Sequence, residues 1–168
     1  MQFWIAQIFG LLGLMAMVYG LFQKKKKVML RYVVYNGLFF SVEYLLLGAL
    51  SGMWSNLFGV CRTFICSQKE TDARLDNFVV LATLMGVYLF IGISSYDGLA
   101  SILPIIAEEI YIISIWQHDE RIIRCGTAVM VIFWFIYDLI MAAYPSAICD
   151  LIVFSSALIS LFVNKKHK

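Results

Sequence analysis

The chain has 168 residues, of which 62% are hydrophobic and only 14% are charged. Soluble domains average about 45–50% apolar and about 25% charged residues, so a soluble core of this length cannot hide so much apolar surface. The composition therefore excludes an ordinary soluble domain and makes the lipid bilayer the expected partner. The net charge of +2 excludes little by itself, but the distribution of the charges is informative.

Seven apolar runs predict an all-α polytopic membrane protein with seven transmembrane helices. Runs of about 18 or more apolar residues are typical of membrane-spanning helices. In chain order the runs are 3–22, 28–50, 53–67, 78–93, 99–116, 122–144 and 147–163. The third run is the shortest and lies at the edge of spanning length. The first run is expected to be a retained helix and not a cleaved signal peptide, because its positive charges follow it.

The basic residues set the expected orientation, because cytoplasmic loops collect Lys and Arg. With seven spans and an external N-terminus, the segments 23–27, 68–76 and 117–121 and the C-terminal tail lie inside. All 13 Lys and Arg residues then lie on or near that side, and the outer connections carry only Asp97. A re-entrant third segment would place two basic residues outside. We therefore predict an external N-terminus and a cytoplasmic C-terminus.

An internal repeat is present at a spacing of 94 residues. At this shift the segment from Gly10 lies over that from Pro104, Glu43 lies over Tyr137, and loops, turns and helix ends coincide without a gap. We therefore predict two parallel three-helix bundles joined by a linker helix. Parallel repeats are a known transporter plan that places the solute near the repeat interface. The predicted units are a first repeat at 1–67, a cytoplasmic loop plus linker helix at 68–97, a second repeat at 98–164 and a basic cytoplasmic tail at 165–168.

Residues 6–69 carry an opening "AQ..G", a "QKKKK" break, "LLLG" before a small outer turn, and "N..G..R" at Asn56, Gly59 and Arg62. In the second half, "LP.I" at 103–106 also fits. These features, in this order, resemble the YgjV-type proteins of the bacterial inner membrane. The resemblance covers most of the chain and implies a multi-pass protein of that membrane.

The three-plus-one-plus-three layout of this resemblance is similar to that of the SWEET sugar carriers and the PnuC vitamin-precursor carriers. The similarity implies passive movement of a small solute by rocking of two three-helix bundles. The chain has no PnuC-like tryptophan pattern, and Pro104 and Pro145 are its only prolines, so it lacks a complete SWEET proline set. The similarity to these carriers therefore does not imply that this chain is specific for sugars or nucleosides.

Charged side chains inside the predicted helices are the main functional candidates, because a charge at a helix centre costs about 2.5–3.5 kcal/mol on insertion scales. At about 1.5 Å per residue, Arg62 and Glu109 come out roughly 8–11 Å from the inner boundary, with Glu108 slightly deeper. We predict a structural ion pair of Arg62 with Glu108 or Glu109. Adjacent helix residues point about 100° apart, so the other glutamate faces the solute pathway or the far side of the bundle.

The candidates for the solute pathway combine neutral polar residues with acidic ones. They are Asn36, Glu43, Asn56, Glu109, Trp134 and Asp138. Acidic residues toward the outer face favour a neutral or cationic solute over an anion, and their crowding is compatible with proton coupling. Two readings stay open, since Trp134 could be an ordinary core aromatic and Asp150 could be solvated near a helix end.

A facilitative small-solute carrier with alternating access is the function that these features favour. The first alternative is a structural or regulatory inner-membrane protein without transport activity, and the second is a membrane enzyme that uses Glu108, Glu109 or Asp138 as acid–base groups. We expect no enzyme, cofactor or metal, because no nucleophile–base pattern occurs and the cysteines lack ligand spacing. No nucleic-acid partner is expected. An oligomer is compatible with the sequence but not required, since one chain holds both repeats.

Overall fold

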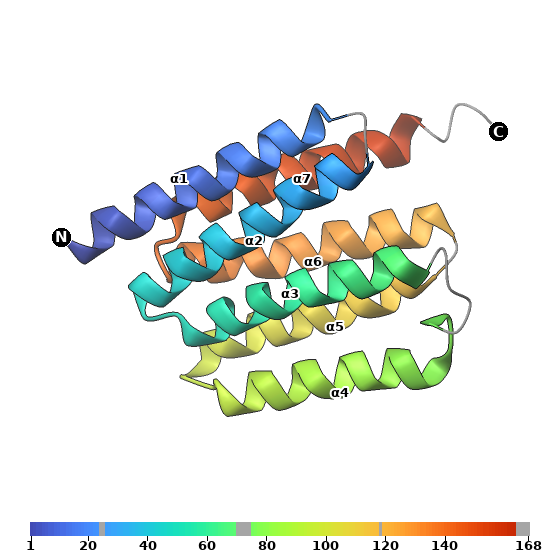
Figure 1. Cartoon of the computed structure of the whole chain (residues 1–168). Coiled ribbons are helices and arrows are strands. Elements are labelled where there is room, and N and C mark those ends of the chain that lie inside the picture. Colours follow the sequence, from blue (N-terminus) through green and yellow to red (C-terminus); the bar gives the residue numbers. More distant parts are fainter. Residues whose placement is uncertain (24–25, 70–74, 118, 164–168) are drawn as a thin grey trace.

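The computed structural model describes residues 1–23, 26–69, 75–117 and 119–163. In this part of the chain the protein is all-helical, as predicted, with seven α-helices (Figure 1). The elements are α1 (Gln2–Leu21), α2 (Lys26–Leu47), α3 (Leu50–Lys69), α4 (Phe78–Ser94), the short 3₁₀ helix η2 (Leu99–Ser101), α5 (Ile102–Trp116), α6 (Glu120–Ile140) and α7 (Tyr144–Val163). Most of the expected loop at 68–76 and the expected tail at 165–168 lie outside the described residues.

Four helical segments are long and apolar enough to cross a membrane, and α4 is a shorter apolar helix. The four are Gln2–Gly20, Leu99–Trp116, Arg121–Ile140 and Tyr144–Phe162. The helices α2 and α3 do not reach this standard within the described residues, although they have 22 and 20 residues. The helix α3 is longer than the predicted run of 53–67. It begins at Leu50 and continues through Gln68 to Lys69.

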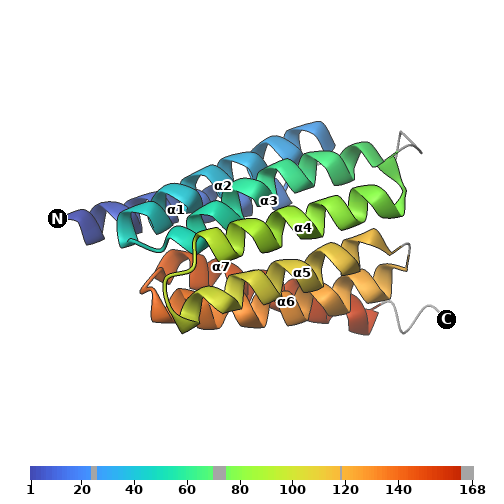
Figure 2. The same ribbon diagram turned by 90° about the horizontal axis from the view of Figure 1, so that it is seen from below.

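The seven helices lie side by side, and each runs opposite to the one before it (Figure 1). α2 packs between α1 and α3, and α6 packs between α5 and α7. Contacts of α1 with α7 and of α3 with α5 join these two groups into a ring of six helices. α4 stays outside the ring and packs against α3 and α5, and Figure 2 shows it at the edge between the two groups.

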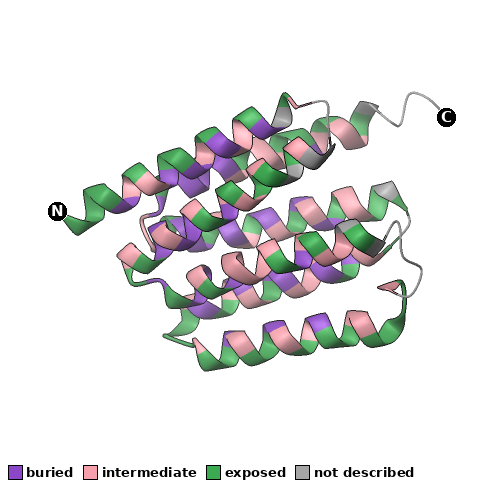
Figure 3. Ribbon diagram, viewed as in Figure 1, coloured by how far each residue is buried: buried purple, intermediate pink, exposed green. Residues whose placement is uncertain are grey.

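Compared with a soluble protein, the locations of apolar and charged side chains are reversed; Figure 3 shows which residues are buried and which are exposed. Large apolar side chains are exposed on the outer faces, as at Phe90 and Ile93 of α4, which are 71% and 73% exposed. Charged side chains are buried instead, with Glu43, Glu108 and Asp138 at 0%, 4% and 1% exposure. This is the pattern of a helical protein whose outer surface is covered by lipid, because a bilayer solvates apolar side chains and not charges.

The turns α2–α3 and α6–α7 share one backbone geometry. Gly48 and Ala142, which are 94 residues apart, both have a left-handed backbone, with φ of 77° and 56°. In each turn the next residue donates its backbone N–H to a carbonyl five residues earlier, at 2.8 Å from Ala49 and 2.9 Å from Ala143. An L-residue with a side chain is strained in this region and glycine is not, so Ala142 carries a cost that Gly48 avoids.

Exchanging the residue type at these two turns should change stability in opposite directions. We expect Ala142→Gly to raise the free energy of unfolding by about 1 kcal/mol and Gly48→Ala to lower it by a similar amount, because the left-handed backbone costs a residue with a Cβ about 1–2 kcal/mol. A Cβ at Gly48 meets nothing within 4 Å, so crowding does not obscure the comparison. Thermal unfolding of the purified variants in detergent measures both effects, and shifts of the same sign would contradict the prediction.

Candidate functional site

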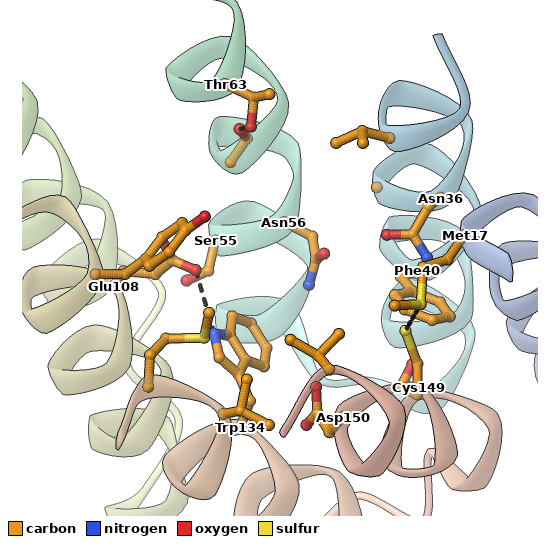
Figure 4. A pocket seen from close by; sticks show the side chains of 18 of the residues that line it. Met17, Asn36, Phe40, Ser55, Asn56, Thr63, Glu108, Trp134, Cys149 and Asp150 are labelled. Atoms are coloured by element: carbon orange, nitrogen blue, oxygen red, sulfur yellow. Dashed lines mark hydrogen bonds between the residues drawn. The ribbon is translucent and has the colours of Figure 1, made fainter. Parts of the chain in front are cut away.

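A cavity of about 270 Å³ lies inside the ring of helices. Each of the six ring helices contributes side chains to its wall, and α4 contributes none. Asn36 on α2 and Asn56 on α3 face each other across the cavity, while Trp134 and Asp150 lie along another wall (Figure 4). This volume lies just below the range of about 300–1,000 Å³ that is usual for ligand pockets.

Arg62 and Glu108 form a buried ion pair at one end of the cavity. The Arg62 guanidinium also lies over the ring of Tyr111, at 4.5 Å from its centroid, and donates to the Tyr88 hydroxyl at 3.4 Å. The other oxygen of Glu108 accepts from Trp134 Nε1 at 3.2 Å (Figure 4). The ion pair and its neighbouring contacts therefore connect α3 to α4, α5 and α6. Of the two glutamates that were predicted as possible partners of Arg62, Glu108 is the one that binds it.

Glu109 lies away from this site. It does not line the cavity, and both of its carboxylate oxygens are buried without a hydrogen-bond partner among the described residues. Because Glu108 faces the cavity, the next side chain along the helix points about 100° away from it. Glu109 was a pathway candidate, and the helical phase of α5 instead turns it toward the other side of the bundle, which the sequence had left open.

Glu43, another of the acidic pathway candidates, also lies outside the cavity wall. Its carboxylate is fully buried, accepts a hydrogen bond from Ser146 Oγ at 2.6 Å, and packs against the backbone of Gly10. A Cβ at Gly10 would overlap the carboxyl group. The close approach of α1 to α2 at this glycine therefore encloses Glu43 between helices.

Two aspartates line the cavity, and only one of them was predicted to do so. Asp138 accepts a hydrogen bond of 2.5 Å from the Tyr44 hydroxyl and is 1% exposed. Asp150 interacts with the Asp138 carboxyl group, and one of its oxygens is buried without a hydrogen-bond partner among the described residues. The sequence held a signal for Asp150, because the 94-residue shift superposes it on Asn56, which was a pathway candidate.

The structure thus brings Asn36, Asn56, Trp134 and Asp138 together around one cavity. Sequence reasoning missed the roles of Tyr44 and Ser146, because their hydroxyl groups act through partners on other helices. Tyr44 donates across the α2–α6 interface and Ser146 across the α2–α7 interface. Such pairings depend on helix packing, which periodicity alone does not determine.

Removing one partner of the buried ion pair should destabilise the fold strongly. We expect Arg62→Ala to lower the free energy of unfolding by about 3–5 kcal/mol, because Glu108 would be left as a stranded buried charge. Arg121→Ala, at an exposed position, is the matched control and should have little effect. The double variant Arg62→Met with Glu108→Gln should recover much of the loss, because neither charge remains. Unfolding in detergent measures all three, and a loss for Arg62→Ala no larger than that for Arg121→Ala would contradict the expectation.

Comparison with known proteins agrees with the helical, apolar character of the chain. The model of the family Imp-YgjV, described as a bacterial inner membrane protein, matches residues 4–168. Searches among curated proteins and among solved structures found no match. The family match confirms the resemblance to YgjV-type proteins. The chain therefore belongs to the Imp-YgjV family of bacterial inner membrane proteins, and its several apolar helices make it a multi-pass protein of that membrane.

Proposed function

We propose that the protein is a carrier for a small solute, which crosses the bilayer through the cavity inside the ring of six helices. The observation that carries this proposal is the cavity itself, whose wall holds two asparagines, two aspartates and an ion pair. Polar groups that serve only to hold helices together can meet in direct contact and need no open space between them. A cavity with charged walls inside a membrane protein is the usual mark of a solute or ion pathway.

Seven membrane spans, with the N-terminus outside and the C-terminus in the cytoplasm, are part of the proposal. The lengths of α2 and α3 correspond to about 33 and 30 Å at 1.5 Å per residue, which is enough to span a bilayer. The polar residues that lower their hydropathy include Asn36, Asn56 and Arg62, and all three line the cavity. Residues of the cavity wall thus account for part of the low hydropathy of α2 and α3, and side chains that face a cavity do not argue against spanning.

A two-fold relation between α1–α3 and α5–α7 is supported by pairs of contacts that match under the 94-residue shift. Ser146 Oγ donates to Glu43, and the backbone N–H of Gly52 donates to the Tyr137 hydroxyl at 3.0 Å. Adding 94 to Glu43 gives Tyr137 and subtracting 94 from Ser146 gives Gly52, so the shift converts the first contact into the second. A pair of parallel repeats around an axis along the membrane normal accounts for this correspondence.

The proposed axis passes near the cavity. Tyr44 donates a hydrogen bond to Asp138, its own counterpart 94 residues later. A residue can contact its own counterpart only close to the axis that relates the two. The 94-residue shift relates α1 to α5 and α3 to α7. The contact of α3 with α5 therefore corresponds to the contact of α7 with α1, and both are present. We infer that the solute moves between the two bundles as they rock against each other, as in SWEET-like and PnuC-like carriers.

Accessibility of the cavity to water from both sides tests the proposal without knowledge of the solute. After replacement of the four native cysteines, the variant Asn56→Cys should react with a membrane-impermeant thiol reagent in right-side-out and in inside-out vesicles, because alternating access opens the cavity to each side in turn. Ser155→Cys, at an exposed position on α7 that should face lipid, is the control and should stay unlabelled. Labelling of the Asn56→Cys variant from one side only, or from neither, would contradict alternating access.

A further inference from the structure

The charge on the cavity wall is unbalanced. Of the described residues that line the cavity, Arg62 is the only base, whereas Glu108, Asp138 and Asp150 are acids. Arg62 is paired with Glu108, so the two aspartates have no basic partner on the wall. Carboxyl groups on one wall repel each other at low dielectric. The wall therefore carries an excess of acidic over basic side chains.

Several hydrogen-bond donors of the cavity wall are already engaged within the protein. The side-chain amides of Asn36 and Asn56 donate to backbone carbonyls at 3.0 and 3.3 Å, and the hydroxyl groups of Thr63 and Thr127 donate to backbone carbonyls at 2.8 Å each. Trp134 donates to the carboxylate of the ion pair. These side-chain groups thus spend donors within the protein, while the side-chain oxygens of the two asparagines remain as acceptors on the wall, together with the hydroxyl groups of Ser55 and Tyr111.

Asp150 supplies the open acceptor at this site. One of its carboxylate oxygens is buried without a hydrogen-bond partner among the described residues, although the residue lies on the cavity wall (Figure 4). Asp138, by contrast, already accepts from Tyr44. A buried acceptor without a donor is costly, and a ligand that brings donors removes the cost. The indole of Trp134 also lines the cavity, and aromatic rings attract cations.

We propose that the solute is a small organic cation that carries N–H donors, of the primary-amine class, and that the carboxylate of Asp150 binds its nitrogen. The inference rests on the proposed carrier function and goes beyond it in naming the solute class and the binding residue. The cavity volume of about 270 Å³ lies just below the usual range for ligand pockets, so the ligand must be small. The asparagine oxygens would accept from the remaining donors of the ammonium group.

Two matched sets of probes test the solute class by binding. Aminoethanol, ethane-1,2-diol and glycolate have similar sizes but differ in charge, and so do benzylamine, benzyl alcohol and benzoate. We expect a saturable rise in melting temperature of the purified protein with the amine of at least one set and not with its neutral or anionic partners, as ligand binding to the folded state requires. Equal stabilisation by all members of a set, or by an alcohol or carboxylate in preference to the amine, would overturn the inference, as would the absence of an effect of both amines.

Substitutions of Asp150 test the binding residue. Asp150→Asn should weaken amine binding at least tenfold, whereas Asp97→Asn, at an exposed position in the α4–α5 connection, should leave it unchanged. Asp150→Glu keeps the charge and should retain part of the affinity, which separates loss of binding from loss of folding. Unchanged amine affinity in a folded Asp150→Asn variant would overturn the role of this residue.

Uptake of labelled amine into proteoliposomes separates this inference from the proposed function. Binding of the amine without uptake would contradict the carrier and leave the binding site in place. Saturable uptake of an alcohol or carboxylate probe without amine binding would contradict the solute class and leave the carrier in place. Binding and saturable uptake of the same amine, both lost in Asp150→Asn, is the result expected when both hold.

Discussion

The ion pair of Arg62 with Glu108 is the interaction on which the arrangement of this bundle depends. Neither charge is stable alone among apolar helices, and each becomes tolerable only when the other lies beside it. Satisfying the pair requires α3 and α5 to meet, and the contacts of Arg62 with Tyr88 and of Glu108 with Trp134 extend the same requirement to α4 and α6. Because α3 and α5 lie in different halves of the chain, this charge requirement holds one of the two junctions that close the ring around the cavity.

Glycine and small residues decide which polar side chains reach the cavity. Gly10 allows α1 to approach α2 so closely that the Glu43 carboxylate fills the space between them, and this acid is thereby withdrawn from the wall. Asp150 has no such cover and stays on the wall. The character of the cavity is thus set by helix separation as much as by the polar residues themselves.

Much of the fold follows from the sequence, because apolar runs, basic loops and a repeat spacing are local or periodic signals. The seven helices follow from the apolar runs, and the partnership of Arg62 with a glutamate followed from matched depth and the cost of a lone charge. The rotation of each helix about its own axis did not follow. That rotation turns Glu109 away from the cavity and encloses Glu43, and it depends on how neighbouring surfaces pack, which one sequence does not reveal. The place of Asp150 on the cavity wall could have been predicted from the sequence, because the 94-residue shift aligns Asp150 with the candidate Asn56.

Under the proposed two-fold relation, the two halves keep one backbone plan while differing at residues near the proposed axis. Gly48 and Ala142 hold the same turn, yet Asn56 in one half corresponds to Asp150 in the other, and both line the cavity. A symmetric backbone with a neutral amide on one side and a carboxylate on the other creates a cavity with two unlike walls. A solute with a charged end and a neutral polar end would bind such a cavity in one orientation, because reversal would place its cation beside an amide and leave the carboxylate without a partner.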